Sequence, residues 1–211
     1  MSTPTAREFV PNTKSIAKLR AAAAHCEGCE LYRAATQTVF GEGPARAKLM
    51  LVGETPGDQE DLDGHPFVGA AGRLLDEVLE EVGIDRKKVY VTNAVKHFKW
   101  TPRGTRRLHA KPSAREITAC RPWLEAEISS VMPELIVCLG ATAAQTLLGR
   151  AFRITIERGK ILTSHWNACV LATFHPAAIL RAPDERSRMT MRKGFAIDLK
   201  IAAGWIRRHG T

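Results

Sequence analysis

The chain has 211 residues, of which 45% are hydrophobic and 25% are charged, as is typical of a folded globular protein. Lysine and arginine outnumber aspartate and glutamate by 31 to 22, and the resulting charge of +9 indicates an anionic partner, most commonly nucleic acid. No segment has the apolar length of a membrane span, and no repeat or low-complexity segment occurs, so we expect one domain over residues 1–211 and no membrane partner.

Helix and strand signals alternate along the chain. The first half predicts a helix over Thr13–Ala24, a strand over Lys48–Glu54, a helix over Gly69–Ile84 and a strand over Lys87–Val95. The second half predicts a helix from Ser113 to Val131, a strand over Pro133–Gly140, a helix over Ala141–Gly149, a strand over Ala168–Phe174 and a helix over Asp184–Arg208. Ser113 and Glu116 form the capping-box pattern that opens a helix.

Strands separated by helices predict an α/β fold with a mainly parallel sheet and helices on both of its faces. In such folds ligands bind beyond the carboxyl ends of the strands. Three unusual segments lie there: "GETPGDQED" after the first strand, "NAVKH" at the end of the second and "HPAAIL" after the fourth. We therefore expect these segments to meet at one edge of the sheet.

The first of these segments continues as "GETPGDQEDLDGHPFVGAAGRLL", from Gly53 to Leu75. Its glycines alone would favour an ordinary strand-to-helix turn with a buried Phe67. However, it carries five acidic residues between Glu54 and Asp63. Carboxylates repel a phosphate, so their presence here is unexpected unless one of them has a chemical role. Phe67 lies in the turn rather than on an amphipathic face, and an aromatic ring held there can stack on a nucleic-acid base.

A basic stretch runs from Lys96 to Arg121, with eight basic residues and Glu116 as its one acid. It includes "GTRRLHAKPS", which has no apolar period and which we expect to be a loop. A charge run of this kind is equally often a solvated face. By itself, His109 could be a bystander, a phosphate contact, a metal ligand or a nucleophile.

The five cysteines fall into two groups. Residues 1–10 show no apolar segment and no cleavage pattern, so we expect a cytoplasmic protein without disulfides. Cys138 and Cys169 lie in apolar strand runs and are expected to be inert core residues. Cys26 and Cys29 form C-x2-C, and Cys120 lies far along the chain. One isolated C-x2-C would not by itself indicate a metal.

Four segments together resemble the signatures of the uracil-DNA glycosylase superfamily, in its iron–sulfur branch. They are "GETPGDQEDLDGHPFVGAAGRLL", "VTNAVKHFKW", "EITACRPWL" and "FHPAAIL", and their order and spacing match over roughly residues 26–180. The resemblance implies a three-layer αβα sandwich around a four-stranded, mainly parallel sheet. It also implies recognition of uracil flipped out of DNA.

The resemblance also implies roles for individual residues. Phe67 stacks on the base, Asn93 reads its edge, His175 faces uracil O2, and Glu54 is the carboxylate that assists attack at the sugar. Gly53, Asp58 and Asp61 are expected to contribute to substrate binding. Thr55 replaces the alanine or glutamine of relatives, and Ala177 replaces a serine that follows the His-Pro pair.

The iron–sulfur branch has four cysteine ligands, and this chain has histidine where relatives place one of them. The resemblance therefore implies a [4Fe-4S] cluster held by Cys26, Cys29, Cys120 and His97, since imidazole can replace thiolate on iron. His25 is a rival donor, but it adjoins Cys26. Three cysteines and one histidine suit zinc equally well, so zinc stays open as the alternative.

Arg106-Arg107-Leu108-His109 resembles the Arg-Arg-Ile-His that ends an arginine-rich insertion in the X family of these enzymes. The resemblance implies that His109 bonds to the sugar after uracil leaves, with Arg107 holding the loop over the abasic site. The expected partner is uracil-containing DNA, single-stranded, bound by a monomer. Two alternatives stay open: a turnover glycosylase whose His109 contacts phosphate, and a non-catalytic DNA-binding module with a structural metal.

Overall fold

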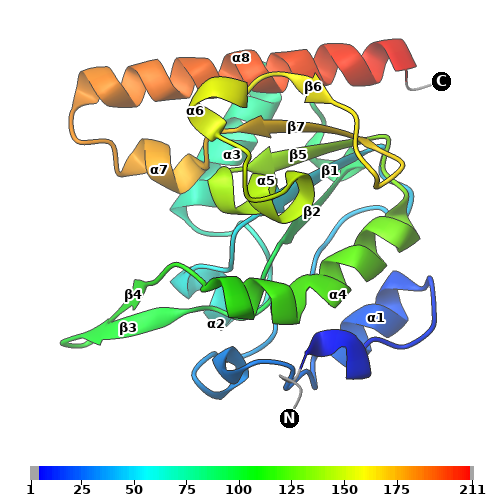
Figure 1. The fold of residues 1–211 in the computed structure, drawn as a ribbon. Helices are drawn as coiled ribbons and strands as arrows, with labels where there is room; N and C mark the ends of the chain where they lie inside the picture. Colours follow the sequence, from blue (N-terminus) through cyan, green and yellow to red (C-terminus); the bar gives the residue numbers. More distant parts are fainter. Residues whose placement is uncertain (1–4, 210–211) are drawn as a thin grey trace.

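The computed structural model describes residues 5–209. Its centre is a sheet in the order β2-β1-β5-β7-β6 (Figure 1). The strands are β1 (Leu49–Gly53), β2 (Val89–Asn93), β5 (Leu135–Leu139), β6 (Ile161–Leu162) and β7 (Cys169–Thr173). The first four in that order run parallel, which confirms the mainly parallel sheet.

The prediction of four strands is wrong, because the antiparallel β6 adds a fifth at one edge. β6 is two residues long and pairs Ile161 with Leu171 and Leu162 with Val170. So short a strand shows no alternation of polar and apolar residues, and its pairing with β7 is set by tertiary contacts rather than by a local pattern.

Helices cover both faces of the sheet because the parallel strands are apolar on both sides. Met50 and Val52 of β1 pack in the core beneath α4 (Ala114–Val131) and α5 (Ala141–Leu148). Leu49 and Leu51 of the same strand point the other way, into the core beneath α3 (Ala70–Glu81) and α8 (Glu185–His209). Because apolar side chains alternate between the two faces, a layer of helices packs on each side of the sheet, as the sequence predicts.

The other helices are short and lie around this core. They are α1 (Ile16–Ala23), α2 (Asp58–Asp63), α6 (Ile154–Glu157), α7 (Pro176–Leu180) and the 3-10 turns η1 (Ala6–Glu8), η2 (Glu30–Arg33) and η3 (Arg86–Lys88). The predicted capping box of α4 is confirmed, since the Ser113 hydroxyl accepts from the Glu116 N–H at 3.3 Å and the Glu116 carboxylate accepts from the Ser113 N–H at 2.6 Å.

The expected loop around "GTRRLHAKPS" is instead a β-hairpin of β3 (Trp100–Arg103) and β4 (Arg106–His109). Gly104 has φ of 58° at the first position of the two-residue connection, a conformation that glycine adopts without strain. Both strands are mostly exposed and rich in arginine, so no hydrophobic pattern marks them. In Figure 1 the hairpin projects from the body below α7.

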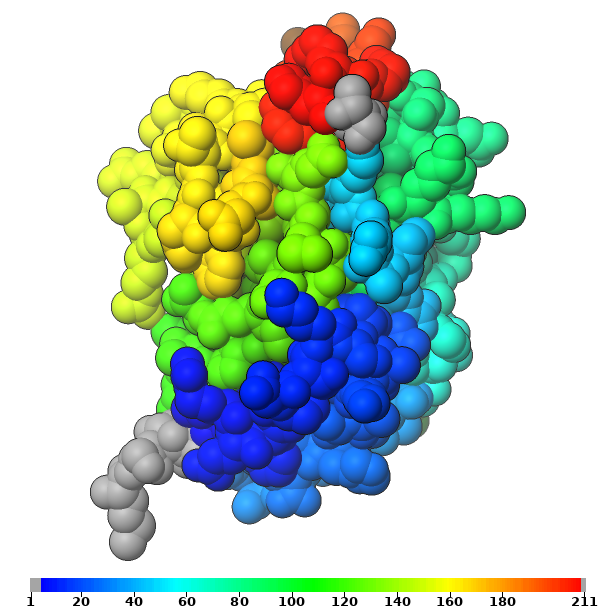
Figure 2. Space-filling view, turned by 90° about the vertical axis from the view of Figure 1, so that its right-hand side faces the viewer, coloured from blue at the N-terminus to red at the C-terminus, as the bar shows by residue number. Residues whose placement is uncertain are grey.

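The N-terminal segment packs against α4 rather than against the sheet. Leu19 of α1, Leu31 of η2 and Trp123 of α4 share a small apolar core with Cys26 and Cys120. Figure 2 shows this blue segment lying against the green middle of the chain. Among residues 5–209, no helix is both long enough and apolar enough to cross a bilayer.

Candidate active site

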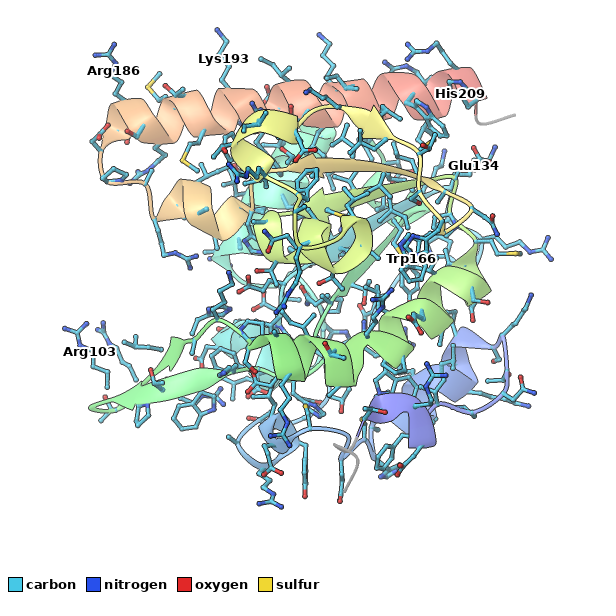
Figure 3. The ribbon with its side chains drawn as sticks, in the orientation of Figure 1. Arg103, Glu134, Trp166, Arg186, Lys193 and His209 are labelled. Atoms are coloured by element: carbon cyan, nitrogen blue, oxygen red, sulfur yellow. The ribbon has the colours of Figure 1, made fainter. Side chains whose placement is uncertain are left out.

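A cleft of about 550 Å³ lies at the carboxyl ends of the parallel strands. Its wall includes five residues that the sequence predicts for the site: Glu54, Phe67, Asn93, His109 and His175. They come from segments after β1, at the end of β2, at the end of β4 and at the start of α7. In Figure 3 this region lies between α7 and the hairpin, on the left of the view.

Gly53 and Asn93 are neighbours in the sheet register at the ends of β1 and β2. A Cβ atom on Gly53 would lie 2.2 Å from Asn93 Oδ1 and 2.7 Å from Phe67 Cζ, so only glycine leaves room for both side chains. Asn93 is 2% exposed, and its amide is thus held at the floor of the cleft. Gly53 therefore contributes to the site by having no side chain.

The Phe67 backbone adopts a left-handed conformation with φ of 60°, which is costly for an aromatic residue. Gly72 of α3 lies so close to it that a Cβ there would be 1.7 Å from the Phe67 carbonyl oxygen. This packing holds the turn in place. The Phe67 ring then lies 6.2 Å from the His175 ring, tilted by 31°.

His175 begins α7, and its Nδ1 accepts a hydrogen bond from the Ala177 N–H at 3.1 Å. A neutral ring with Nδ1 as acceptor carries its proton on Nε2. Burial lowers the pKa of His175 to about 4, and the positive charge of Arg181 adds to this. The imidazole is therefore neutral at physiological pH and has one N–H to donate.

Glu54 and Thr55 follow β1 directly. The Glu54 carbonyl accepts from the Val95 N–H at 3.0 Å, which ties this turn to the end of β2, and the residue lines the cleft. The Thr55 hydroxyl donates to the His97 carbonyl at 2.8 Å. Thr55 thus fastens the same two segments together.

His109 is the last residue of β4, opposite Trp100 in the hairpin, and its ring lies 6.1 Å from that of Phe98. Partial burial lowers the pKa of His109, while the nearby Glu54 carboxylate acts in the opposite direction. Its imidazole is consequently in the free-base form at neutral pH. The hairpin delivers a neutral histidine to the cleft that holds Glu54.

Arg107 fixes the hairpin to the body of the protein. Its guanidinium pairs with Asp58 and Asp61 at 2.6 Å each and donates to the Thr36 hydroxyl at 3.2 Å. It also lies over the rings of Phe98 and Trp100 on its own hairpin, at 5.3 and 5.8 Å. Asp58 and Asp61 therefore face Arg107 and not the cleft, and their contact with substrate stays a prediction.

The sequence profile of the uracil DNA glycosylase superfamily matches residues 40–200. The chain belongs to this superfamily. It is 39% identical to a type-4 uracil-DNA glycosylase of Sulfurisphaera tokodaii over 82% of this chain and 79% of the relative. It is 38% identical to a type-4 uracil-DNA glycosylase of Thermotoga maritima over 88% and 91%, and 27% identical to a type-5 uracil-DNA glycosylase of Pyrobaculum aerophilum over 65% and 64%.

Three of the four predicted metal ligands gather in this member of the superfamily. Cys26, Cys29 and Cys120 belong to the apolar cluster between the N-terminal segment and α4. The Trp123 indole donates to Cys26 Sγ at 3.1 Å, and the Lys96 backbone N–H donates to Cys120 Sγ at 3.2 Å. Burial raises the pKa of the Cys120 thiol to about 12, and the nearby Cys29 and Cys26 add to this. Gathered sulfurs with N–H donors suit a thiolate-bound metal group.

His97, the fourth predicted ligand, is placed differently. Its Nε2 lies 2.9 Å from the Thr38 hydroxyl, and burial lowers its pKa to about 4. Within residues 5–209, no three side chains of histidine, cysteine, aspartate or glutamate are arranged around a common metal position. The three cysteines therefore share one apolar cluster without forming a coordination site, and the ligand set stays a prediction. Cys138 is fully buried in the sheet core, as expected.

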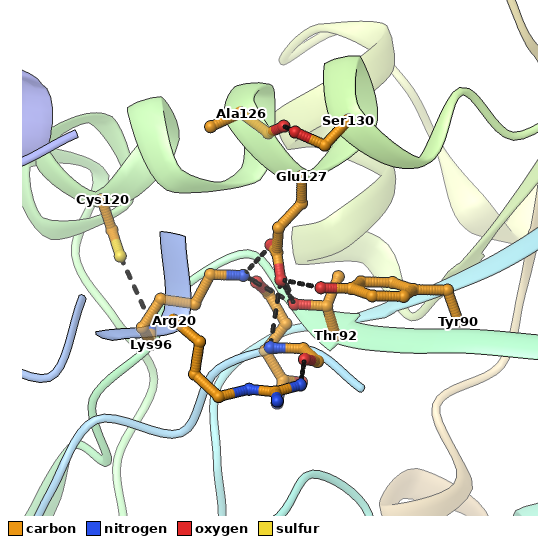
Figure 4. Close-up of polar contacts among 10 residues, drawn as sticks. Arg20, Tyr90, Thr92, Lys96, Cys120, Ala126, Glu127 and Ser130 are labelled. Carbon is orange, nitrogen blue, oxygen red and sulfur yellow. Dashed lines mark hydrogen bonds and ion pairs between the residues drawn. The ribbon is translucent and has the colours of Figure 1, made fainter. Parts of the chain in front are cut away.

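Sequence reasoning missed a buried ion pair, which lies near Cys120 (Figure 4). Lys96 pairs with Glu127 of α4, and the two are 1% and 0% exposed. Lys96 Nζ also donates to the Asn93 carbonyl at 2.7 Å, while Glu127 accepts from the Tyr90 hydroxyl at 3.0 Å. Thr92 bonds both partners, at 2.6 Å to Lys96 and 2.9 Å to Glu127. Lys96 therefore connects Cys120, through its backbone, to the residue expected to read uracil.

Proposed function

We propose that the protein excises uracil from DNA and then becomes covalently attached, through His109, to the resulting sugar. The observation that carries this proposal is that His109 opens onto the same cleft as Asn93, His175 and Glu54. Membership of the uracil-DNA glycosylase superfamily and the type-4 relatives support the excision step.

In this proposal Phe67 and Asn93 bind the flipped base. A uracil flipped from DNA needs a stacking surface and partners for its edge. Phe67 supplies a ring held rigidly by its turn, and the Asn93 amide can accept from N3–H and donate to O4. Gly53 keeps the space between them open.

Breaking the bond between sugar C1′ and uracil N1 sends the electron pair into the departing base. Negative charge then grows on uracil O2. The neutral His175 Nε2–H is suited to donate there, and a preorganised donor of this kind lowers the barrier by roughly 3 kcal/mol. Glu54 stabilises the positive charge that develops on the sugar.

In the second step a ring nitrogen of His109 forms a bond to C1′. The second nitrogen then loses its proton, and Glu54 is the acceptor in the same cleft. The product is a neutral N-glycosyl imidazole. Its leaving group would be an imidazolide anion, so water does not release it readily and each molecule acts once.

Arg107 acts on the hairpin and not on the substrate. Its pairs with Asp58 and Asp61 hold β4 against α2, which keeps His109 at the cleft. These two carboxylates, expected to touch substrate, have this positioning role in our proposal.

The proposed cofactor is a [4Fe-4S] cluster held by Cys26, Cys29, Cys120 and His97, with zinc as the alternative. When bound, it ties the N-terminal segment to α4 and to the end of β2. His97 can serve as the fourth ligand through Nδ1 while its Nε2–H keeps the hydrogen bond to Thr38, whose own hydroxyl donates to the Ala23 carbonyl. Aerobically purified protein should be brown and contain iron. Colourless protein with stoichiometric zinc would overturn the iron assignment and leave the ligands intact.

A denaturing gel of the protein mixed with uracil-containing DNA tests the proposed function. We expect a band of covalent complex, and none with the matching thymine-containing strand. Free abasic DNA without a complex would indicate a turnover glycosylase. Unchanged DNA would indicate a binding module, and would overturn the excision step itself.

A further inference from the structure

A second, larger groove of about 1120 Å³ adjoins the cleft. Lys111 and Thr142 line both cavities, so the two meet at these residues. The groove runs between the first half of α4 on one side and α5 with residues 163–165 on the other. None of the steps described above uses it.

The groove is strongly basic. Its lining includes Lys111, Arg115, Arg121 and Arg150, and it contains no aspartate or glutamate. Arg121 pairs with Glu125 at 2.9 Å and lies 5.4 Å from the Trp166 ring centroid. Within residues 5–209, the other three cations form no ion pair with a carboxylate. Unpaired cations along a concave surface are suited to an anionic chain.

One aromatic ring, that of His165, also lines the groove. Its centroid lies 4.4 Å from that of Trp166, whose indole packs against the core and donates to the Leu147 carbonyl. Cations that follow a backbone, together with flat rings that accept any base, are the two elements of single-strand binding. Hydroxyl groups of Thr142 and Thr163 add polar contacts along the path.

We infer that this groove holds the single-stranded DNA on one side of the target nucleotide. The inference rests on the proposed function, because the flipped base in the cleft must be joined to a strand that leaves the cleft near Lys111. It gives a role to Lys111, Arg115 and Arg121 of the basic stretch, which the catalytic residues do not require.

The test replaces the two arginines of the groove that pair with no carboxylate, in the double variant Arg115→Gln/Arg150→Gln. Binding of a fluorescent, uracil-free single strand is followed by anisotropy at several salt concentrations. We expect about tenfold weaker binding at low salt and a log–log salt slope shallower by about 1.4, since each lost phosphate contact on a single strand contributes about 0.7. An unchanged affinity and slope would overturn the inference.

The matched control is Arg186→Gln/Lys193→Gln on α8. It removes the same charge from exposed residues whose side chains point away from the groove (Figure 3). The control should bind like the unaltered protein. An equal loss in both double variants would mean that only net charge matters, and would also overturn the inference.

Two further measurements test which flank of the target nucleotide occupies the groove and whether the bound DNA is single-stranded. Oligonucleotides with uracil next to the 5′ end or next to the 3′ end should differ in reaction rate, because only one flank occupies the groove; equal rates would contradict this. A duplex that binds as tightly as the single strand, with the same loss in the variant, would contradict the single-stranded assignment. Because the uracil-free strand reports binding alone, the groove is tested even if no uracil is released.

Discussion

At Gly53 the packing leaves no space for a side chain. We expect Gly53→Ala to slow uracil release by roughly 100-fold, because displacing the Asn93 amide or the Phe67 ring by about 1 Å misplaces the base. Initial rates of uracil release measure this. Gly204→Ala on α8 is the control, since its new Cβ has no contact closer than 3.5 Å and should leave the rate unchanged. Equal rates in both variants would place the base elsewhere.

His109 must be neutral to act as a nucleophile. Burial lowers its pKa below the ordinary 6.5, so the free base predominates above that pH and is lost as the pH falls through the lowered pKa. We expect adduct formation to be constant from about pH 7 upward and to fall only below about pH 6.5. His175, with a pKa of about 4, stays neutral across this range. A rate that already declines between pH 8 and pH 7 would contradict the free-base requirement.

The sequence predicted which segments meet at the cleft, but it did not predict the contacts between buried side chains. Phe67, Asn93 and His175 lie in the cleft wall because the carboxyl ends of parallel strands meet at one edge. The ion pair of Lys96 with Glu127 joins residues 31 positions apart. A lysine in a basic stretch is normally exposed, so no local pattern indicated that this one is buried.

Among the elements, the position of the hairpin depends on the ion pairs of Arg107 with α2. Arg107→Ala removes both carboxylate pairs and should slow adduct formation by roughly 10- to 100-fold, because β4 no longer holds His109 at the cleft. Quench-flow measurement of the adduct gives this rate. Arg103→Ala, at the exposed tip of the same hairpin, is the control and should have a smaller effect. If the two variants react alike, Arg107 does not position the hairpin.

The link between β2 and α4 is a stability element. Lys96→Met leaves the buried Glu127 carboxylate without its cation and should lower the free energy of unfolding by about 3–5 kcal/mol. The double variant Lys96→Met/Glu127→Gln removes both charges and should recover much of this loss. Urea unfolding followed by tryptophan fluorescence measures both. A single variant as stable as the unaltered protein would show that the pair is not stabilising.

Elements with long apolar runs could be predicted, and those made by tertiary contacts could not. β1 and β5 are buried on both faces and appear as continuous apolar segments in the sequence. The hairpin strands are exposed and stabilised by Arg107 contacts to α2, far away in the chain. The two-residue β6 likewise depends on β7 for its pairing.

At the scale of the whole molecule, part of the positive charge lies beside the cleft. Cations of the hairpin and of the groove lie on either side of the catalytic residues, and Lys111 lies where groove and cleft meet. In our proposal these cations hold DNA at the carboxyl edge of the sheet, where His109 and Glu54 line the same cleft. The sequence indicated an anionic partner, and the surface that we propose for it could be located only in the fold.

The central claim is that His109 becomes bonded to the sugar, and His109→Ser tests it most directly. This change removes the nucleophile and keeps Asn93, His175 and Glu54 in the cleft. Water can enter the vacated space, so the variant should release uracil and leave abasic DNA. On a denaturing gel the unaltered protein should form a stable complex with uracil-containing DNA, and His109→Ser should form none. A His109→Ser protein that still becomes attached to the DNA would contradict the account.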